Sequence, residues 1–299
     1  MFDYKLLAAL AAVVEQAGFD RAAQALGLSQ SAISQRIKLL EARVGQPVLL
    51  RGSPPKPTEV GRRLLNHVQQ VRLLERDIQG QIPALMEAGT GPERLRIAIN
   101  ADSLATWWAP AIAGFCSERN LVLDLVVEDQ EVGLKRMRAG DVAACVCGAD
   151  RAVSGARSIA LGAMRYRALA SPAYIRRYFP GGVDQAALPK SPAVVFGPDD
   201  ALQHRYLESL GFSGTFPHHL CPSSEGFVNL VANGLGWGLV PELQAQDLLA
   251  RGELVELLPD RPIDVPLYWH YWRTGGALLE ALTGELLRTA GQLLVPADS

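Results

Sequence analysis

The chain has 299 residues, a net charge of −2 and a hydrophobic share of 48%. Its length allows two or three domains with real cores, and no run of 18 apolar residues is present that would span a membrane. Residues 1–92 hold 11 Lys and Arg against 8 Asp and Glu, a charge of +3, whereas the remainder carries −5, so the N-terminal part is the end that suits nucleic acid.

The first segment has an apolar run from Leu6 to Val14 that an export signal would also contain. A signal needs a basic start, however, and here Asp3 precedes Lys5 while Glu15 directly follows the apolar run. We therefore expect this segment to be the first helix of an N-terminal domain, and we expect the protein to be cytoplasmic.

Residues 19–38 predict a helix-turn-helix. A short helix from Asp20 to Leu26 is broken by Gly27, and the Ser29 hydroxyl can cap a second helix. Apolar residues recur on one stripe of that helix at Ile33, Ile37, Leu40 and Val44. The opposite face carries donors and acceptors suited to base edges and phosphates, namely Gln30, Ser31, Ser34, Gln35 and Lys38. An ordinary amphipathic helix with a solvated polar face is the alternative.

A wing and a long helix are predicted next. The strand-like run 47–50 is followed by Arg51 and by the stiff basic loop 54–57, so Arg51 is expected to meet phosphates or the minor groove. Thr58 can cap a helix whose apolar side recurs at Leu65, Val68, Val71 and Leu74. We expect this helix to pair with a second copy, because two half-sites read together are more specific than one.

Three sequence segments carry a resemblance to a known family. The pattern AAxxLxxSQSAxSxxIKxLE, followed by a Pro-rich wing, resembles the LysR-type transcriptional regulators. The segments QPVLLRGSPPKPTEVG and NADSLATW resemble the branch of that family that senses lysine and arginine and drives a basic amino acid exporter gene. Leu50 departs from the wider family, in which many members carry Phe. The resemblance implies a regulator that binds double-stranded promoter DNA as a homodimer or homotetramer, with RNA polymerase as a further partner.

The C-terminal part predicts an α/β architecture. The helical period is lost between Gly80 and Glu93, where Pro and Gly indicate a linker. Strands then alternate with helices, which predicts a parallel sheet under helices, over residues 95–100, 103–118, 121–129, 132–140 and 142–148. A second unit begins near Tyr166 and continues through elements at 193–197, 224–234 and 237–241, before a strand at 267–272 and a helix at 278–294.

These unequal units predict an α + α/β protein with a two-lobed effector domain of the periplasmic-binding-protein type. The expected parts are a winged helix-turn-helix domain at 1–58, a linker and dimerisation helix with a hinge at 59–92, and the effector-binding domain at 93–299. The resemblance further implies that the last strand and helix return to the first lobe. Lobe I then comprises residues 93–163 and 269–299, and lobe II comprises residues 164–268.

A ligand is expected where strands end and helices begin, since open α/β sheets bind ligands at their carboxyl edge. That rule selects Asp102, Ser103, Trp107, Glu128, Asp129, Ser223, Ser224 and Glu225. Helix capping is the alternative for Asp102 and the serines, a solvated loop for Glu128 and Asp129, and the hydrophobic core for Trp107.

The expected ligand is a basic amino acid. Carboxylates near the strand ends favour a cationic group, and serines at helix N-termini suit an α-carboxylate. The choice of L-lysine or L-arginine rests on the resemblance alone. A LysR-type regulator that responds to an anionic metabolite is the alternative.

Other classes of protein fit less well. A transporter's solute-binding protein should carry an export signal and lack the first 92 residues, and an architectural DNA binder would not need two lobes. No catalytic constellation is present, so we do not expect an enzyme. The four cysteines, at Cys116, Cys145, Cys147 and Cys221, are expected to be small packed residues, and neither a metal nor a cofactor is expected.

Overall fold

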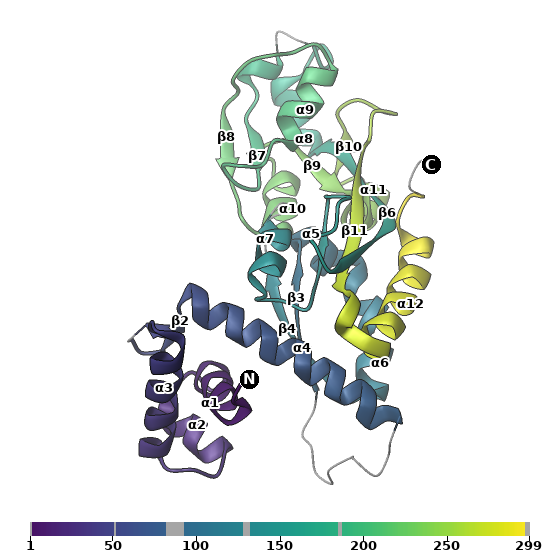
Figure 1. Ribbon diagram of the computed structural model, residues 1–299. Helices are drawn as coiled ribbons and strands as arrows, with labels where there is room; N and C mark the ends of the chain where they lie inside the picture. Colours follow the sequence, from purple (N-terminus) through teal and green to yellow (C-terminus); the bar gives the residue numbers. More distant parts are fainter. Residues whose placement is uncertain (1, 51, 82–92, 128–131, 185–186, 297–299) are drawn as a thin grey trace.

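The computed structural model describes residues 2–50, 52–81, 93–127, 132–184 and 187–296. The N-terminal part is a small helical domain with a two-stranded wing, followed by one long helix (Figure 1). Its elements are α1 (Tyr4–Glu15), α2 (Phe19–Ala25), α3 (Gln30–Val44), β1 (Leu49–Leu50), β2 (Lys56–Pro57) and α4 (Glu59–Gln81). The two strands pair antiparallel, which confirms the predicted winged helix-turn-helix.

The winged helix closes on one hydrophobic core. As predicted, Ile33, Ile37 and Leu40 of α3 are buried, and they pack against α1 and Val48. The first half of α4 joins the same core, because Val68 is only 6% exposed and Leu65 packs beside it. Leu65 and Val68 therefore belong to the core of their own domain, which corrects the expectation that they face a second copy.

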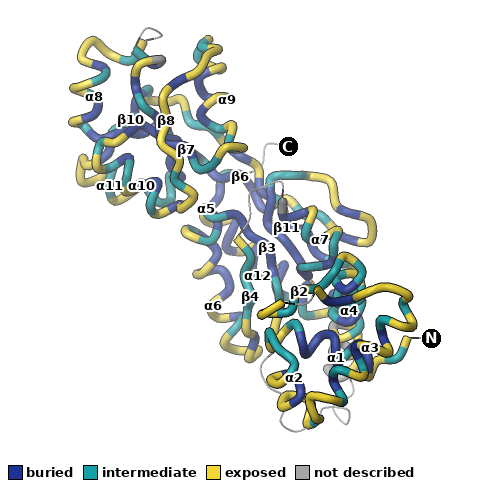
Figure 2. The backbone as a smooth tube through the Cα atoms, turned by 90° about the vertical axis from the view of Figure 1, so that its left-hand side faces the viewer, coloured by how far each residue is buried: buried dark blue, intermediate teal, exposed yellow. Residues whose placement is uncertain are grey.

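The C-terminal part is built on a curled sheet with the strand order β10-β6-β11-β5-β3-β4, in which β9 also pairs with β6. The strands are β3 (Glu93–Ile99), β4 (Leu121–Val127), β5 (Ala144–Cys147), β6 (Ala156–Ala170), β9 (Gly238–Pro241), β10 (Val255–Glu256) and β11 (Ile263–Trp272). A smaller parallel pair is formed by β7 (Ala193–Val195) and β8 (His218–Leu220). Residues of the central strands are mostly buried, and exposed residues lie mainly at the rims (Figure 2).

Lobe I surrounds the parallel strands β4, β3 and β5, as the alternation of strands and helices predicted. Its helices are α5 (Ala101–Ser103), the π-helical turn η2 (Leu104–Trp108), α6 (Ala109–Glu118), α7 (Val132–Ala139) and α12 (Gly276–Leu293). The two faces of β5 serve different clusters: Ala144 and Val146 pack with α6 and α12, whereas Cys145 and Cys147 pack with α7. Both cysteines are fully buried small residues, as expected.

Lobe II lies at the other end of the sheet and contains β7 to β10. Its helices are α8 (Pro172–Tyr178), η3 (Leu188–Lys190), α9 (Leu202–Ser209), α10 (Ser224–Ala232) and α11 (Glu242–Ala250). The two lobes share β6 and β11, which pair antiparallel from Ala156 to Tyr166 of β6 and over the whole of β11. The register shifts between Leu267 and Tyr268, next to Gly162, whose φ of +126° and contact with the carbonyl of Val295 require glycine. The predicted crossing strands are therefore confirmed.

The helix α4 lies against lobe I as well as against the winged helix. It contacts α7, α12 and the short turn η4 (Arg273–Gly275). At the end of α7, Gly140 has a φ of +76°, and a Cβ placed there would lie 2.0 Å from the side chain of Asn66 on α4. The two helices therefore approach so closely at this point that only glycine fits.

Tryptophans form much of the core of the C-terminal part. The rings of Trp107 and Trp108 lie 5.9 Å apart, and Trp269 lies 6.0 Å from Trp108. The indole of Trp269 donates to Thr283 of α12 at 2.9 Å, which ties the last helix to the sheet. In lobe II the ring of Trp237 packs 6.0 Å from Tyr206. Among the described helices, none is long and apolar enough to cross a membrane.

Gly61 offers a test of the packing between α4 and the wing. A Cβ at this position would lie 2.0 Å from the carbonyl oxygen of Val48. We expect Gly61→Ala to destabilise the winged helix by about 1–3 kcal/mol, the usual cost of overpacking. Gly114→Ala in α6, where nothing lies within 4 Å, is the control and should stabilise its helix by up to about 1 kcal/mol.

Hydrogen exchange measured by mass spectrometry reports the protection of the winged helix and of the C-terminal part separately. Faster exchange in residues 4–44 is expected for Gly61→Ala, with no change in residues 93–296. Equal protection of residues 4–44 in the two variants would contradict the close packing.

Candidate functional site

The helix α3 presents a polar face on the outside of the winged helix. Its cap is Ser29, whose Oγ accepts a hydrogen bond from the Ala32 amide at 3.2 Å and lies 2.9 Å from the Ser31 hydroxyl. The predicted DNA-facing side chains lie near this N-terminal end: Gln30, Ser31, Gln35 and Lys38 are exposed, and Ser34 is half-buried. Gln30, Ser31, Ser34 and Gln35 therefore lie on the first two turns of α3, and Lys38 lies in its middle.

The wing strands β1 and β2 follow α3 and lead into α4. Thr58 fixes the base of the wing, because the Thr58 hydroxyl donates to the Pro47 carbonyl at 2.9 Å and accepts from the Gly61 amide at 3.0 Å. The predicted cap of α4 is thus present. Arg51 lies outside the described residues.

A cleft of about 910 Å³ separates the two lobes. Its wall begins where β3, β5 and β7 end, at Asn100, Gly148 and Phe196, and its floor includes Tyr166 of the crossing strand β6. The cleft therefore lies at the carboxyl ends of strands, where α/β sheets bind ligands.

Asp102 joins the lobes across this cleft. Its Oδ1 accepts a hydrogen bond from the Ser224 hydroxyl of α10 at 2.6 Å, and its Oδ2 accepts one from the Tyr166 hydroxyl at 2.6 Å. The Ser224 hydroxyl also lies 3.0 Å from Oε1 of Gln244. A serine hydroxyl has one proton, so it can donate to only one of these two acceptors at a time. If Asp102 were protonated, its carboxyl group would donate to the Ser224 oxygen. The hydroxyl proton of Ser224 would then be free to donate to Gln244.

The same surroundings shift the pKa values of Asp102 and Tyr166. Burial raises the pKa of Asp102, the hydrogen bonds from Ser224 and Tyr166 lower it in part, and the nearby charge of Asp200 raises it further. Burial, together with the charge of Asp102, holds the pKa of Tyr166 well above its ordinary value. Tyr166 is therefore a hydrogen-bond donor at neutral pH, and a cation beside Asp102 would favour the ionised form of its carboxyl.

Charges of both signs line the cleft. Asp199 and Asp200 lie on the loop between β7 and α9, and the Asp200 carboxylate accepts from the amides of Phe196 and Leu202 at 3.1 and 2.9 Å. The lining cations are Lys135 of α7 and Arg205 of α9. With all groups counted at their formal charge, three carboxylates and two cations leave one excess negative charge, which favours a cationic ligand.

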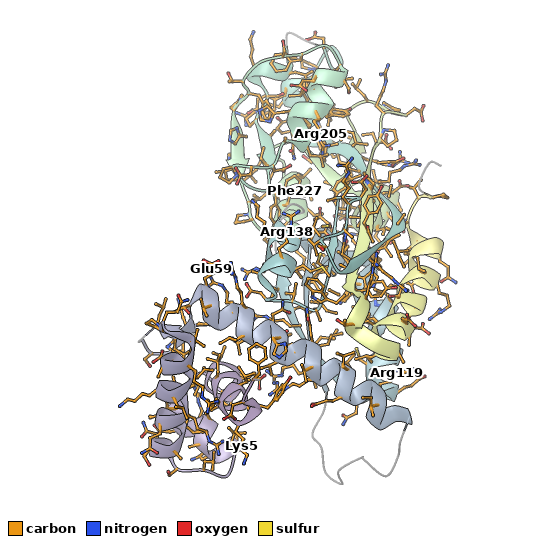
Figure 3. All side chains as sticks on the ribbon, in the orientation of Figure 1. Lys5, Glu59, Arg119, Arg138, Arg205 and Phe227 are labelled. Atoms are coloured by element: carbon orange, nitrogen blue, oxygen red, sulfur yellow. The ribbon has the colours of Figure 1, made fainter. Side chains whose placement is uncertain are left out.

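Two aromatic side chains supply apolar wall. Phe227 of α10 is 5% exposed and packs against Gly238, where a Cβ would lie 2.5 Å from the ring. Phe196 directly follows β7 of lobe II and also lines the cleft. Figure 3 shows Phe227 and Arg205 among the side chains of the upper lobe. An aliphatic stem or a planar cation would fit against such faces.

The structure brings only some of the predicted effector residues to the cleft. Asp102 and Ser224 line it. Ser103 and Trp107 are fully buried in lobe I and are not among its lining residues. Ser223 caps α10 by accepting from the Gly226 amide, and Glu225 is exposed beside it. Glu128 and Asp129 lie outside the described residues.

Several lining residues were missed by the sequence reasoning. Asp199 and Asp200 lie on the loop that follows β7, so they are near a strand end, but the rule did not single them out. Lys135 lies inside a helix and Tyr166 inside a strand, and no local signal marks them. Their place at the cleft follows only from the way the sheet curls.

Family models match both parts of the chain. A model described as bacterial regulatory helix-turn-helix protein of the lysR family matches residues 4–62. A model described as LysR substrate binding domain matches residues 88–290.

Full-length relatives are similar throughout. The HTH-type transcriptional regulator ArgP of Pseudomonas fluorescens strain Pf0-1 is 74% identical over 298 residues, covering 100% of both chains. The crystal structure of ArgP from Mycobacterium tuberculosis superposes with a TM-score of 0.83 at 36% identity and covers 100% of both chains. LysG from Corynebacterium glutamicum, solved with bound effector Arg, has a TM-score of 0.72 at 35% identity over 99% of this chain and 100% of that one.

These relatives are transcriptional regulators and not enzymes, as the sequence predicted. The winged helix, the two-lobed domain with its cleft, and the similarity over the full length agree with one another. The chain belongs to the LysR family of transcriptional regulators.

Proposed function

We propose that the chain binds promoter DNA through α3 and the wing, and that L-arginine or L-lysine in the interlobe cleft modulates this binding. The target would be a basic amino acid exporter gene, with RNA polymerase as the partner at the promoter. The observation that carries the proposal is a cleft whose lining charges are net negative, in a chain that also holds a winged helix. A protein that acts on promoters works in the cytoplasm, where the bacterial chromosome lies.

The charges of the cleft favour a basic amino acid over an anionic metabolite. The cationic end and the α-ammonium need carboxylates when desolvated, and Asp102, Asp199 and Asp200 line the cleft. We propose that Asp102 and Asp199 contact the ligand and that Ser224, which donates to Asp102, orients that carboxylate. LysG, which is 35% identical to this chain, has arginine as its bound effector, and this supports the same class of ligand here.

At the DNA, we propose that the α3 residues Gln30, Ser31, Ser34 and Gln35 read or orient on base edges. Lys38 and Arg51 would meet phosphates or the minor groove. The exposure of four of these side chains beside the capped end of α3 supports the assignment.

A homodimer would present two winged helices to two half-sites, and a tetramer would pair such dimers. We propose that the second half of α4 forms the contact. Leu74 is 45% exposed and Ile78 is 50% exposed, whereas Leu65 and Val68 of the first half are committed to the winged-helix core. A second copy would remove these apolar side chains from water.

The proposed base readers can be tested on a mapped operator. Ser34→Ala and Gln35→Ala should each weaken binding by about 1–3 kcal/mol at one operator position. Lys38→Ala and Arg51→Ala should weaken binding to all DNA sequences. Each should also lower the slope of log affinity against log salt concentration by about one. Gln246→Ala, on the exposed side of α11, is the control. Operator affinity and selectivity that stay at the wild-type level in the Ser34 and Gln35 variants would refute the assignment.

The dimer contact can be tested with charges at exposed positions. Leu74→Glu combined with Ile78→Glu should give the mass of one chain in light scattering and lose operator binding, because two charges would be buried at the contact. Both side chains are exposed, so circular dichroism should remain that of the wild type. Leu287→Glu, at an exposed position of α12, should leave the mass unchanged. A wild-type mass of one chain would exclude the proposed dimer.

The ligand can be tested by calorimetric titration of the full chain with L-arginine and L-lysine. Asp102→Asn should weaken binding by about 10- to 100-fold, the effect of losing a charged hydrogen-bond partner. Because the pKa of Asp102 is raised, its carboxylate becomes neutral at a higher pH than usual, so wild-type affinity should fall as the pH drops through that pKa.

The Asp102→Asn variant should lack this pH dependence, whereas Asp247→Asn, on the exposed side of α11, should keep it. Heat from an anionic compound and none from either basic amino acid would overturn the proposed ligand.

A further inference from the structure

Lys135 and Arg205 face the same cleft from opposite lobes. Lys135 lies on α7 of lobe I and Arg205 on α9 of lobe II, and both line the cavity that holds Asp102. Within the described ranges, no hydrogen bond or ion pair involves either side chain's cationic group. Arginines on the neighbouring strand β6 differ, because Arg165 forms a bidentate pair with Asp264, and Arg167 is paired with Glu242 and Glu256.

The nearby carboxylates do not neutralise these two cations. The Asp102 carboxylate accepts from the Ser224 and Tyr166 hydroxyls, the Asp200 carboxylate accepts from two backbone amides, and among the described residues neither forms an ion pair with Lys135 or Arg205. Lys135 and Arg205 are exposed and solvated in this open cleft. If the lobes closed without a ligand, two like charges would lose water and approach each other, which is unfavourable. An anion between them would reverse that balance.

The serines expected to hold an α-carboxylate are otherwise engaged. Ser103 is fully buried, Ser223 caps α10 outside the cleft lining, and the Ser224 hydroxyl donates to Asp102. The helical run α5–η2–α6 begins at Ala101 beside Asp102, and its N-terminus offers an anion only a partial positive charge. The carboxylate of a ligand therefore needs another partner in this cleft.

We propose that Lys135 and Arg205 together bind the α-carboxylate of the ligand, one from each lobe, and that this shared anion holds the lobes closed. The inference rests on the proposed function, since it takes the ligand to be a basic amino acid. The cationic end of that ligand would then meet Asp102 and Asp199, and its carboxylate would lie between the two cations. Specificity for an amino acid over the corresponding amine would come from this pair.

Agmatine and cadaverine test this directly, because they are arginine and lysine without the carboxylate. Calorimetric titration of the full chain should give wild-type binding of L-arginine at least about 100-fold tighter than of agmatine, as two charged contacts are lost. The same order is expected for L-lysine over cadaverine.

Single substitutions test whether Lys135 and Arg205 bind the carboxylate. Lys135→Met and Arg205→Met keep the apolar stems and should each weaken L-arginine by about 10- to 100-fold. Agmatine should bind these variants as well as, or better than, it binds the wild type, because a repelling cation is gone. Arg138→Met, on the same helix as Lys135 but not among the cleft-lining residues, is the matched control for the loss of one positive charge (Figure 3). It should leave both affinities unchanged.

The outcomes separate the two proposals. If neither L-arginine nor L-lysine binds the wild type, the proposed function and this inference both fail. If L-arginine binds but agmatine binds equally well, the carboxylate is not held and only the inference fails. Equal losses of L-arginine and agmatine in the Lys135 and Arg205 variants would also overturn it, because they would indicate a structural role.

Discussion

The pairing of β6 with β11 sets the position of almost everything else in the C-terminal part. The ladder runs from Ala156 opposite Trp272 to Tyr166 opposite Ile263, so both lobes grow from one continuous pair of strands. Breaking it would expose unpaired backbone groups in the middle of the molecule. The lobes are therefore tied together by this ladder, whose register is irregular beside Gly162. The cleft floor, with Tyr166, lies on this same ladder.

The sequence predicted the local elements well and the long-range ones less well. The buried stripe of α3 and the Thr58 cap follow from spacing and side-chain chemistry within a few residues. The strand β6 was expected only from about Tyr166, because Gly162 and interspersed charges interrupt the alternation that marks a strand. It begins at Ala156, since its partner β11 supplies the hydrogen bonds that the local pattern does not announce.

The same limit applies to the site. Asp102 and Ser224 follow strand ends or open helices, and a local rule finds them. Their mutual hydrogen bond spans 122 positions of sequence, so no spacing reveals it. Val68 shows the converse: helical periodicity places it on an apolar stripe, but it does not say whether that stripe meets its own domain or a second copy. Here α4 serves both its own winged helix and lobe I, where Asn66 lies against Gly140. The helix α7 thus lines the cleft through Lys135. The residue that follows its last turn, Gly140, contacts α4.

The distribution of tryptophan gives the molecule a built-in optical label. All five tryptophans, from Trp107 to Trp272, belong to the C-terminal part, and residues 1–106 contain none. Light absorbed selectively by indole is therefore re-emitted only from the two lobes. Trp107, Trp108, Trp237 and Trp269 are fully buried, so their emission should be blue and weakly quenched until the lobes themselves loosen. Fluorescence then follows the state of the ligand-binding half while the winged helix stays dark, and the two halves can be monitored separately in the intact chain.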